Sequence, residues 1–526
     1  ALRVAQSGSF NVLVITRPAS PDESNTRYAQ GGIVSRGPSD SADLLVQDVL
    51  VAGAGCCLPA AVRLLAEEGP ALVQRVLIEE AGVVFDRDAA GAWSYTREGG
   101  HSARRILHVG DATGRTIQKC LLARLRQLPH VTLRTGLTAI DLITSSHHIE
   151  NPLARYEPPT CLGAYVYDAE GKRVHRVLAR HTILATGGLG RIYRYTTNPE
   201  GARGDGLAMA YRAGARVLNT EYIQFHPTTL AIPGADNFLI SEAVRGEGAK
   251  LYTPDGRHFM ETHAPEWGDL APRDIVARAI HYEMVTHGYP HVLLDLASTM
   301  PGDRIVARFP NIHAECLKHG IDMTERPIPV VPAAHYSCGG IFVDEWGQSS
   351  IRRLYAVGEV SCTGLHGANR LASTSLLEGL VWGDRAGRHI AEHDGPALYP
   401  PSDVPPWQEA DDEQGPDAVL LQHDHRNIQN TMWLYVGLAR NAHRLGRALR
   451  DLGNLRESIE QFYRTNRITD ELIGLRNMAH TALIVAVSAW RNRRSWGAHY
   501  REDAEEGPLG ATAKTTHIEF DAKAEF

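Results

Sequence analysis

An apolar run that ends in glycine and an acid, Leu354-Tyr355-Ala356-Val357-Gly358-Glu359, constrains the fold of this chain more than any other segment. Short apolar runs bounded by glycine are typical of strands that are covered on both faces. This run therefore predicts a buried strand that carries a carboxylate to its C-terminal end. Ligands of open α/β sheets bind at that end of the strands. The sequence predicts an α/β sheet with a binding site beside Glu359.

The loop that follows this strand supplies polar groups to the same place. It runs from Gly364 to Arg370, and Ser373, Thr374 and Ser375 then offer caps to a helix that begins at Leu376. The free N–H groups at the start of a helix can bind an anion or a carbonyl oxygen. One loop is thus predicted to hold a cofactor and a substrate side by side.

Length and charge limit the classes of protein to which this chain can belong. A chain of 526 residues predicts two or three domains, and 54 Lys and Arg against 61 Asp and Glu give no reason to expect a nucleic-acid or membrane-surface partner. The apolar run 481–490 is too short to cross a bilayer. Seven cysteines without a C-x-x-C pair argue against a zinc site or a disulfide framework. We expect a soluble cytoplasmic protein without a metal, in which Cys338 is a small buried residue rather than a reactive thiol.

The pattern of elements changes along the chain. β-Branched runs alternate with helical periodicity over 1–220, whereas 221–334 is dense in Pro, Gly and His, and strands return after residue 335. Leucines at 434, 438, 445, 449 and 452 keep helical spacing beyond a proline-rich linker, and a second helical block follows. These shifts predict an α/β domain over 1–220 and 335–398, an insertion over 221–334, a helical bundle over 407–504 and a poorly ordered tail over 505–526.

Four residues beside glycine- or proline-marked turns are cationic or can become so: His226, Arg273, His335 and Arg370. Each has a plainer interpretation, such as a structural histidine or a surface ion pair of Arg273 with Asp274 or Glu266. Taken together they favour a dicarboxylate site, because such a ligand needs two separate anion clamps and Arg offers a bidentate fork.

Other motifs are ambiguous when taken alone. Glu98, in the turn Glu98-Gly99-Gly100-His101-Ser102, is either part of a solvated loop or an acid for a substrate that carries an amine. Gly31-Gly32 permits close backbone approach to a ring or a phosphate, although such a pair is more often only a turn. Asp205, before a helical run, is typical of an ordinary N-cap.

Taken in order, these motifs resemble the flavoprotein family of succinate dehydrogenase and fumarate reductase. The match runs from about residue 11 to 503. Besides the stretches around 335–341 and 358–376, it includes Asn25 to Gly32, Glu98 to Gly114, Thr196-Thr197-Asn198-Pro199, Gly204-Asp205-Gly206, His226-Pro227-Thr228, Arg245-Gly246-Glu247-Gly248 and Pro272-Arg273-Asp274.

The resemblance implies an α/β FAD-binding Rossmann-like domain, an inserted α+β capping domain over 221–334 and a C-terminal helical bundle. It also implies roles for single residues. Those expected to contact FAD are Arg17, Asn25, Thr26, Arg27, Tyr28, Ala29, Gln30, Gly31, Gly32, Asp205, Glu359, Ser375 and Leu376. Those expected to bind the substrate carboxylates are His226, Ser241, Glu242, His335 and Arg370. Arg273 occupies the family's proton-transfer position, and its proton acceptor is expected to be Glu242 or Glu247.

Two positions discriminate within the family. Members that attach FAD covalently carry a His where this chain has Asn25, which implies noncovalent FAD. The segment around Glu98 is similar to that of members that oxidise L-aspartate, where the acid suits the ammonium group. The resemblance thus implies oxidation of L-aspartate to iminoaspartate in NAD biosynthesis, with O2 or fumarate as electron acceptor and a possible handover of the imine to quinolinate synthase.

Two departures from the family pattern keep alternatives open. The family's first strand and its G-x-G-x-x-G loop have no counterpart in the sequence, and Trp496 replaces an Arg, which predicts a weaker contact with the catalytic domains. The alternatives are the flavoprotein subunit of a fumarate reductase or succinate dehydrogenase, and a truncated noncatalytic fragment.

Overall fold

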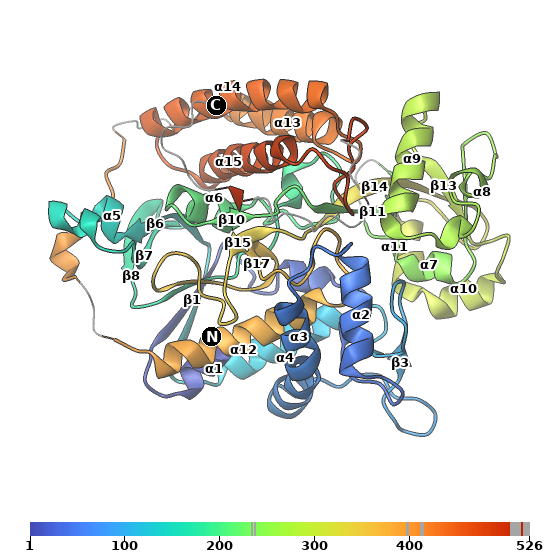
Figure 1. Ribbon diagram of the computed structural model, residues 1–526, viewed down its shortest axis with the longest axis horizontal. Coiled ribbons are helices and arrows are strands. Elements are labelled where there is room, and N and C mark those ends of the chain that lie inside the picture. Colours follow the sequence, from blue (N-terminus) through green and yellow to red (C-terminus); the bar gives the residue numbers. More distant parts are fainter. Residues whose placement is uncertain (233–234, 236–237, 396–398, 411–414, 505–516, 519–526) are drawn as a thin grey trace.

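A computed structural model describes residues 1–232, 235, 238–395, 399–410, 415–504 and 517–518. Figure 1 shows three groups of elements: a body of short sheets and helices, a cap around α9 at one end, and a layer of long helices, α13 to α15, across one face. The predicted fold class, an α/β body with a mixed cap and a C-terminal helical region, is confirmed. Apart from strand β18 (His517–Ile518), the predicted tail over 505–526 lies outside the described residues.

Parallel strands form the centre of the body. The predicted strand β16 (Leu354–Ala356) pairs in parallel with β9 (Thr182–Leu184), and β1 (Val12–Thr16) pairs in parallel with β5 (Val131–Thr135). Each pair forms a separate two-stranded sheet. The short helix η6 (Gly358–Val360) follows β16, so Glu359 stands beyond the carboxyl end of a buried strand, as predicted.

Smaller sheets and helices complete the body. The other strands are β2 (Ile33–Val34), β3 (Tyr95–Thr96), β4 (Ile106–Leu107), β6 (Leu137–Thr144), β7 (Cys161–Asp168), β8 (Arg173–Leu178), β10 (Val217–Leu218), β15 (Gly340–Phe342) and β17 (Ser361–Cys362). The helices are α1 (Leu2–Gln6), η1 (Asn25–Tyr28), α2 (Ala42–Ala52), α3 (Pro59–Leu72), η2 (Val73–Glu80), α4 (Thr113–Arg126), α5 (Ser145–His148), η3 (Pro152–Tyr156), η4 (Gly190–Ile192), α6 (Asp205–Arg212), α12 (Ser375–Glu392) and η7 (Pro401–Asp403).

The cap has a sheet and a hydrophobic core of its own. Its strands lie in the order β11 (Ile223–Leu230), β14 (Ile328–Ser337), β13 (Val292–Asp295) and β12 (Lys250–Tyr252), and all neighbours are antiparallel. The helices are α7 (Glu242–Gly246), α8 (Met260–His263), η5 (Gly268–Leu270), α9 (Arg273–His287), α10 (Gly302–Arg308) and α11 (Pro310–Lys318). The core of the cap is separate from the large core that the body shares with the C-terminal helices.

The C-terminal helices are α13 (Ala418–Tyr435), α14 (Ala442–Thr465) and α15 (Asp470–Arg491). The leucines whose helical spacing predicted this bundle fall on two helices: α13 ends at Tyr435, and Leu438 lies in the turn before α14. Leu438 is buried from this turn, while Leu434 is exposed on α13. By length and composition α15 could cross a membrane, but 89% of its most apolar stretch is buried inside the protein. It is therefore a core helix.

Candidate active site

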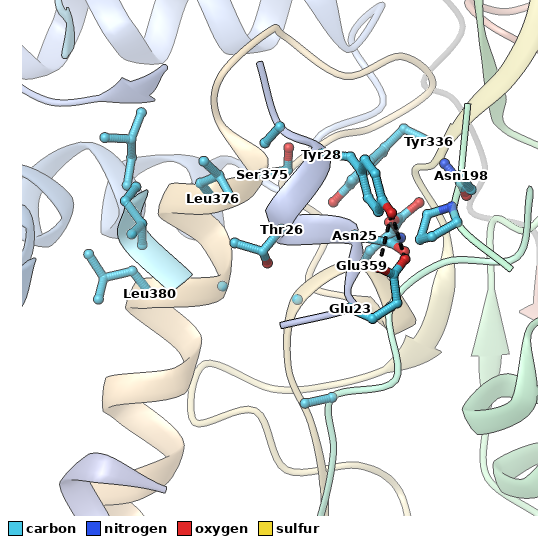
Figure 2. A pocket seen from close by; sticks show the side chains of 18 of the residues that line it. Glu23, Asn25, Thr26, Tyr28, Asn198, Tyr336, Glu359, Ser375, Leu376 and Leu380 are labelled. Atoms are coloured by element: carbon cyan, nitrogen blue, oxygen red, sulfur yellow. Dashed lines mark hydrogen bonds between the residues drawn. The ribbon is translucent and has the colours of Figure 1, made fainter. Parts of the chain in front are cut away.

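A cavity of about 980 Å³ opens between η1, the carboxyl end of β16 and the N-terminal end of α12. Many of the predicted cofactor and substrate residues line it: Arg17, Asn25, Thr26, Tyr28, Ala29, Gln30, His335, Glu359, Arg370, Ser375 and Leu376. Figure 2 shows Asn25 and Glu359 side by side, with Ser375, Leu376 and Leu380 of α12 opposite them. Gln30 also reaches the cap, because its Nε2 donates to the carbonyl of Leu239 at 3.2 Å.

Glu359 is held by two hydrogen bonds at the edge of this cavity. Asn25 Nδ2 donates to Glu359 Oε2 at 2.9 Å, and the backbone N–H of Ser337 donates to Oε1 at 3.1 Å. Burial nevertheless raises the pKa of Glu359 to about 7. A carboxyl group poised near neutrality therefore lies where the sequence placed it.

Replacing Glu359 by Gln should remove a pH dependence from the stability of the FAD-free protein. The folded pKa of about 7 lies above the value of about 4.3 in an unfolded chain, so between these values the folded state binds the additional proton. The free energy of unfolding of the parent therefore falls as the pH rises through this window, by up to about 3 kcal/mol. Urea unfolding at about pH 5 and about pH 7.5 measures the fall, which should be smaller in Glu359→Gln. An equal fall in both proteins would show that Glu359 is not its source.

The side chains of Ser373, Thr374 and Ser375 do not cap α12, so this prediction is wrong. The helix begins at Ser375 with no side-chain cap on its N-terminus. Ser373 donates to Glu98 Oε2 at 2.8 Å, and Thr374 donates to the carbonyl of Leu371. Ser375 Oγ accepts from Arg370 Nη1 at 2.5 Å. These hydroxyls form hydrogen bonds with ionised side chains and a loop carbonyl. They therefore do not bond the first N–H groups of α12, which stay open to a ligand.

Arg370 fixes the protonation of His335. Arg370 Nη2 lies 3.1 Å from His335 Nε2, and because guanidinium only donates, Nε2 must be the acceptor. His335 Nδ1 then carries the proton and donates it to Thr197 Oγ1 at 2.8 Å. Burial, together with Arg370, holds the pKa of His335 well below its usual range. His335 is a neutral support for Arg370 and adds no positive charge.

His226 is also neutral. Its Nδ1 lies 3.1 Å from the carbonyl oxygen of Thr228 and 3.2 Å from the backbone N–H of the same residue, so Thr228 fixes the orientation of the ring in either tautomer. Burial and the nearby Arg273 hold the pKa of His226 well below its usual range. The expectation of up to four cationic groups is therefore corrected: Arg273 and Arg370 carry the charge, and the histidines supply directed hydrogen bonds.

Arg273, at the start of α9, pairs with the predicted site residue Glu242. The plainer surface pairing of Arg273 is wrong, since Asp274 bonds Arg278 instead. Burial alone would raise the pKa of Glu242, but Arg273 and Arg245 lower it. Ser241 caps α7 by accepting from the N–H of Ala243, and Glu242 is the first residue of that helix.

Glu98 is half-buried and belongs to the same cluster as Arg273. It accepts from Ser373, and a Cβ at Gly31 would lie 2.6 Å from its Oε1, so Gly31 makes room for this carboxylate. Burial raises the pKa of Glu98, and the charge of Arg273 opposes the shift. The solvated-loop interpretation is wrong.

Several predicted residues lie away from the cavity wall. Its lining residues do not include Arg27, Gly31, Gly32, Glu98, His226, Ser241, Glu242 and Arg273. A Cβ at Gly32 would lie 2.3 Å from the Leu107 carbonyl, so this turn needs glycine for close packing. Asp205 is neither an N-cap nor a lining residue. Its carboxylate accepts from Arg203 and from Asn477 of α15, so it joins the body to the C-terminal helices.

The structure adds Gln224 to the site and explains Trp496 and Cys338. Gln224 Oε1 accepts from Arg370 Nε at 3.3 Å, while its Nε2 donates to the carbonyl of Arg370. Gln224 stands two residues before His226 on β11, and residues two apart on a strand share a face, but no strand was predicted here from the sequence. Trp496 packs into a cluster that includes Cys338, and the backbone beside it bonds the carbonyl of Ala368, so the predicted loss of contact does not occur. Cys338 is buried, as predicted, and burial raises its pKa.

The cavity suits a large planar cofactor with polar edges. The α-carbons of Gly358 and Gly379 face open space, and Gly358 has a φ of 71°, which favours glycine. Asn25, Glu359 and Ser375 supply donors and acceptors beside the open N–H groups of α12. An isoalloxazine ring has a flat apolar face and carbonyl and N–H edges, so the FAD expected from the sequence fits this set of groups.

Known proteins are similar to this chain over most of its length. The family model of an FAD binding domain matches residues 1–376, and that of the fumarate reductase flavoprotein C-terminus matches 425–523. L-Aspartate oxidase 1 of Ralstonia nicotianae is 46% identical over 94% of this chain and 91% of its own length. L-Aspartate oxidase of Yersinia pestis is 43% identical over 96% of this chain and 93% of its own length.

Solved structures show the same architecture. A variant of E. coli quinol fumarate reductase superposes with a TM-score of 0.85 at 26% identity, over 99% of this chain and 92% of that one. Mycobacterium smegmatis Sdh1 gives a TM-score of 0.81 at 27% identity, over 99% and 92% of the two chains. The chain therefore belongs to the L-aspartate oxidases of the succinate dehydrogenase and fumarate reductase flavoprotein family, and its cofactor is FAD.

Proposed function

We propose that this protein oxidises L-aspartate to iminoaspartate and passes the electrons to O2 or to fumarate. The observation that carries the proposal is Glu98, a carboxylate beside Ser373 and Arg273 in a site otherwise built to bind carboxylates. Succinate and fumarate give such an acid no partner, whereas aspartate brings an ammonium group. Relatives at 43–46% identity that are named L-aspartate oxidase support the same substrate.

Different side chains bind the carboxylate and ammonium groups of aspartate. Arg370 offers its guanidinium to one carboxylate, and Nε2 of His226 is the ring nitrogen that Thr228 does not engage. Glu98 suits the ammonium group, and its ionised form is the one that binds. Burial raises the pKa of Glu98, so this carboxyl group becomes protonated at a higher pH than an ordinary Glu. We therefore expect kcat/KM for aspartate to decline on acidification, and the decline should begin at a higher pH than an ordinary Glu would cause. Bound FAD supplies the chemistry of hydride acceptance, and the chain's task is to orient Cα and exclude water.

In fumarate reduction, Arg273 is our candidate for the group that donates a proton to carbon. Its proton must be replaced, and Glu242, its ion-pair partner, is the proposed acceptor that relays a proton from solvent to Arg273. Glu247, the other acceptor expected from the sequence, pairs with Arg308 near the surface and is not part of this proposal.

Glu98→Gln should separate the two substrates. We expect kcat/KM for aspartate to fall about 10- to 100-fold, as for a lost hydrogen bond to a charged group, while fumarate reduction stays within about threefold. Steady-state assays of both reactions measure the split. Glu247→Gln, a carboxylate change on the cap surface, is the matched control and should leave both reactions unchanged. Equal loss of both activities in Glu98→Gln would remove Glu98 from ammonium recognition.

Flavin reduction without O2 tests the function itself. Aspartate should bleach the visible absorbance of the FAD-loaded protein, which establishes the oxidase half-reaction. Bleaching by succinate alone would favour the flavoprotein subunit of a fumarate reductase or succinate dehydrogenase. Failure to retain FAD would favour a noncatalytic fragment. The pairing of Asn25 with Glu359 supports noncovalent FAD.

The proposal extends to the cellular setting. Iminoaspartate is an unstable imine, and we propose that it enters NAD biosynthesis in the cytoplasm through handover to quinolinate synthase. The burial of α15 supports a protein that works without a membrane. Detection of quinolinate in a coupled assay with that synthase measures the handover, and a yield no higher than with free imine would argue against direct transfer.

A further inference from the structure

Arg370 rests on the face of a buried tyrosine. Its guanidinium carbon lies 4.5 Å from the ring centroid of Tyr336, which is 6% exposed. Tyr336 follows His335 on β14, and the pairing of β14 with β11 skips His335. Such a bulge re-aims a side chain, which explains how two consecutive strand residues both meet Arg370. His335 contacts the guanidinium at its edge and Tyr336 contacts its face.

The hydroxyl of Tyr336 points to a second buried group, Glu378, in the first turn of α12. Tyr336 donates to Glu378 Oε2 at 3.1 Å, and Thr363 donates to Oε1 at 2.6 Å. His366 Nε2 lies 2.9 Å from Oε2, and because a carboxylate only accepts, Nε2 must carry the proton. Glu378 is 1% exposed and is thus bonded on both oxygens.

This arrangement does not resemble ordinary core packing. A buried carboxylate with three polar partners is costly to desolvate, and an apolar core of the same volume would be at least as stable. Hydrogen bonds to both oxygens of Glu378 nevertheless fix a single geometry, even though His366 Nδ1 has no hydrogen-bond partner among the described residues. Thr363, His366, Arg370 and Glu378 all lie on one stretch of chain, and Tyr336 joins that stretch to β14.

We propose that Tyr336 is a positioning residue that holds Arg370 in its carboxylate-binding orientation, and that Glu378 fixes Tyr336 through its hydroxyl. The inference rests on the proposed function only in taking Arg370 as an anchor for a substrate carboxylate. It assigns a task to a buried Tyr, His and Glu cluster that touches neither the substrate ammonium nor the proton-transfer pair. The cluster acts on binding, and it therefore affects every dicarboxylate alike.

Succinate binding to the FAD-loaded protein tests the proposal without any turnover of aspartate. Tyr336→Phe keeps the ring but removes its hydrogen bond to Glu378. We expect succinate to bind about tenfold more weakly to this variant, and the perturbation of flavin absorbance measures that binding. Tyr336→Leu, which also removes the aromatic face, should weaken binding further. In steady state, Tyr336→Phe should raise KM for aspartate and for fumarate together and change kcat little.

Tyr193→Phe is the matched control. Tyr193 is also fully buried, and its hydroxyl donates to the carbonyl of Val436, away from Arg370. The two Phe variants should lose similar thermal stability and retain FAD equally, yet only Tyr336→Phe should lose succinate affinity. Glu378→Gln should weaken succinate binding like Tyr336→Phe, and the double variant should lose little more than either, because both changes act through one path.

Each result decides the question. Parent-like succinate binding in Tyr336→Phe, or full additivity in the double variant, would overturn the proposal. So would a loss in Tyr336→Phe matched by Tyr193→Phe. If aspartate fails to bleach the parent but succinate binds and the variants behave as expected, the proposed function falls and the positioning role stands. If the FAD-loaded parent does not bind succinate, Arg370 is not a dicarboxylate anchor and the positioning role falls with it.

Discussion

Replacing Arg370 by Lys should lower kcat/KM for both L-aspartate and fumarate by about 10²- to 10³-fold, as expected when one partner of a buried, hydrogen-bonded charge pair is lost. The guanidinium of Arg370 meets Ser375, His335 and Gln224 at three separate nitrogens. A lysine ammonium is a point charge that cannot occupy these positions together, so it keeps the charge and loses the orientation. Both reactions should suffer because both substrates carry the carboxylate that Arg370 binds.

Steady-state kinetics with each substrate, together with succinate binding, measure this loss. Arg388→Lys is a suitable control, because Arg388 also lies on α12 but pairs with Asp384 and Glu68 rather than with the groups around Arg370. It should keep parent activity. Near-normal kinetics in Arg370→Lys would mean that another group anchors the carboxylate.

Replacing Arg273 by Gln should lower fumarate reduction by about 10²- to 10⁴-fold, the usual contribution of a positioned general acid. Aspartate oxidation should fall much less, by about tenfold, because that half-reaction removes a hydride from Cα and requires no proton delivery to carbon. Assays of fumarate reduction with a reduced dye, and of flavin bleaching by aspartate, compare the two reactions under anaerobic conditions.

Two further variants test whether Glu242 relays the proton to Arg273. Glu242→Gln should also impair fumarate reduction, since Glu242 contacts Arg273 and its pKa is lowered by Arg273 and Arg245 against the effect of burial. Arg278→Gln, on the same helix as Arg273 but paired with Asp274, should behave like the parent. Equal losses of both reactions in Arg273→Gln would indicate a role in binding alone.

Local patterns predicted much of the fold. The buried strand before Glu359, the return of strands after the cap and the helical C-terminal region all follow from apolar periodicity, which reports burial directly. The break between α13 and α14 was not predictable in this way, because Leu438 keeps the helical spacing while packing from a turn. Periodicity cannot distinguish a buried residue in a helix from one in a well-placed loop.

The sequence was enough to select the site residues, but their protonation states depended on partners that are distant in the chain. His335 is neutral because it meets Arg370 and Thr197, which are 35 and 138 residues away. In the sequence, the hydroxyls of Ser373 and Ser375 look like helix caps. In the structure they bond Glu98 and Arg370 instead, because hydrogen bonds with ionised partners are stronger. Such competition is decided by tertiary contacts alone.

Strands β11 and β14 run between the body and the cap (Figure 1). Each has one end in the hydrophobic core of the body and the other in that of the cap. Ile223, Phe225 and Ala334 pack in the body, whereas Leu230, Ile328 and Val330 of the same strands pack in the cap. The pairing of β11 with β14 is irregular between these ends, where His226 and His335 lie. Arg370 belongs to the body, and Arg273 belongs to the cap. A ligand that contacted both arginines would therefore connect the two hydrophobic cores, whereas an anion short enough to reach only one of them would not.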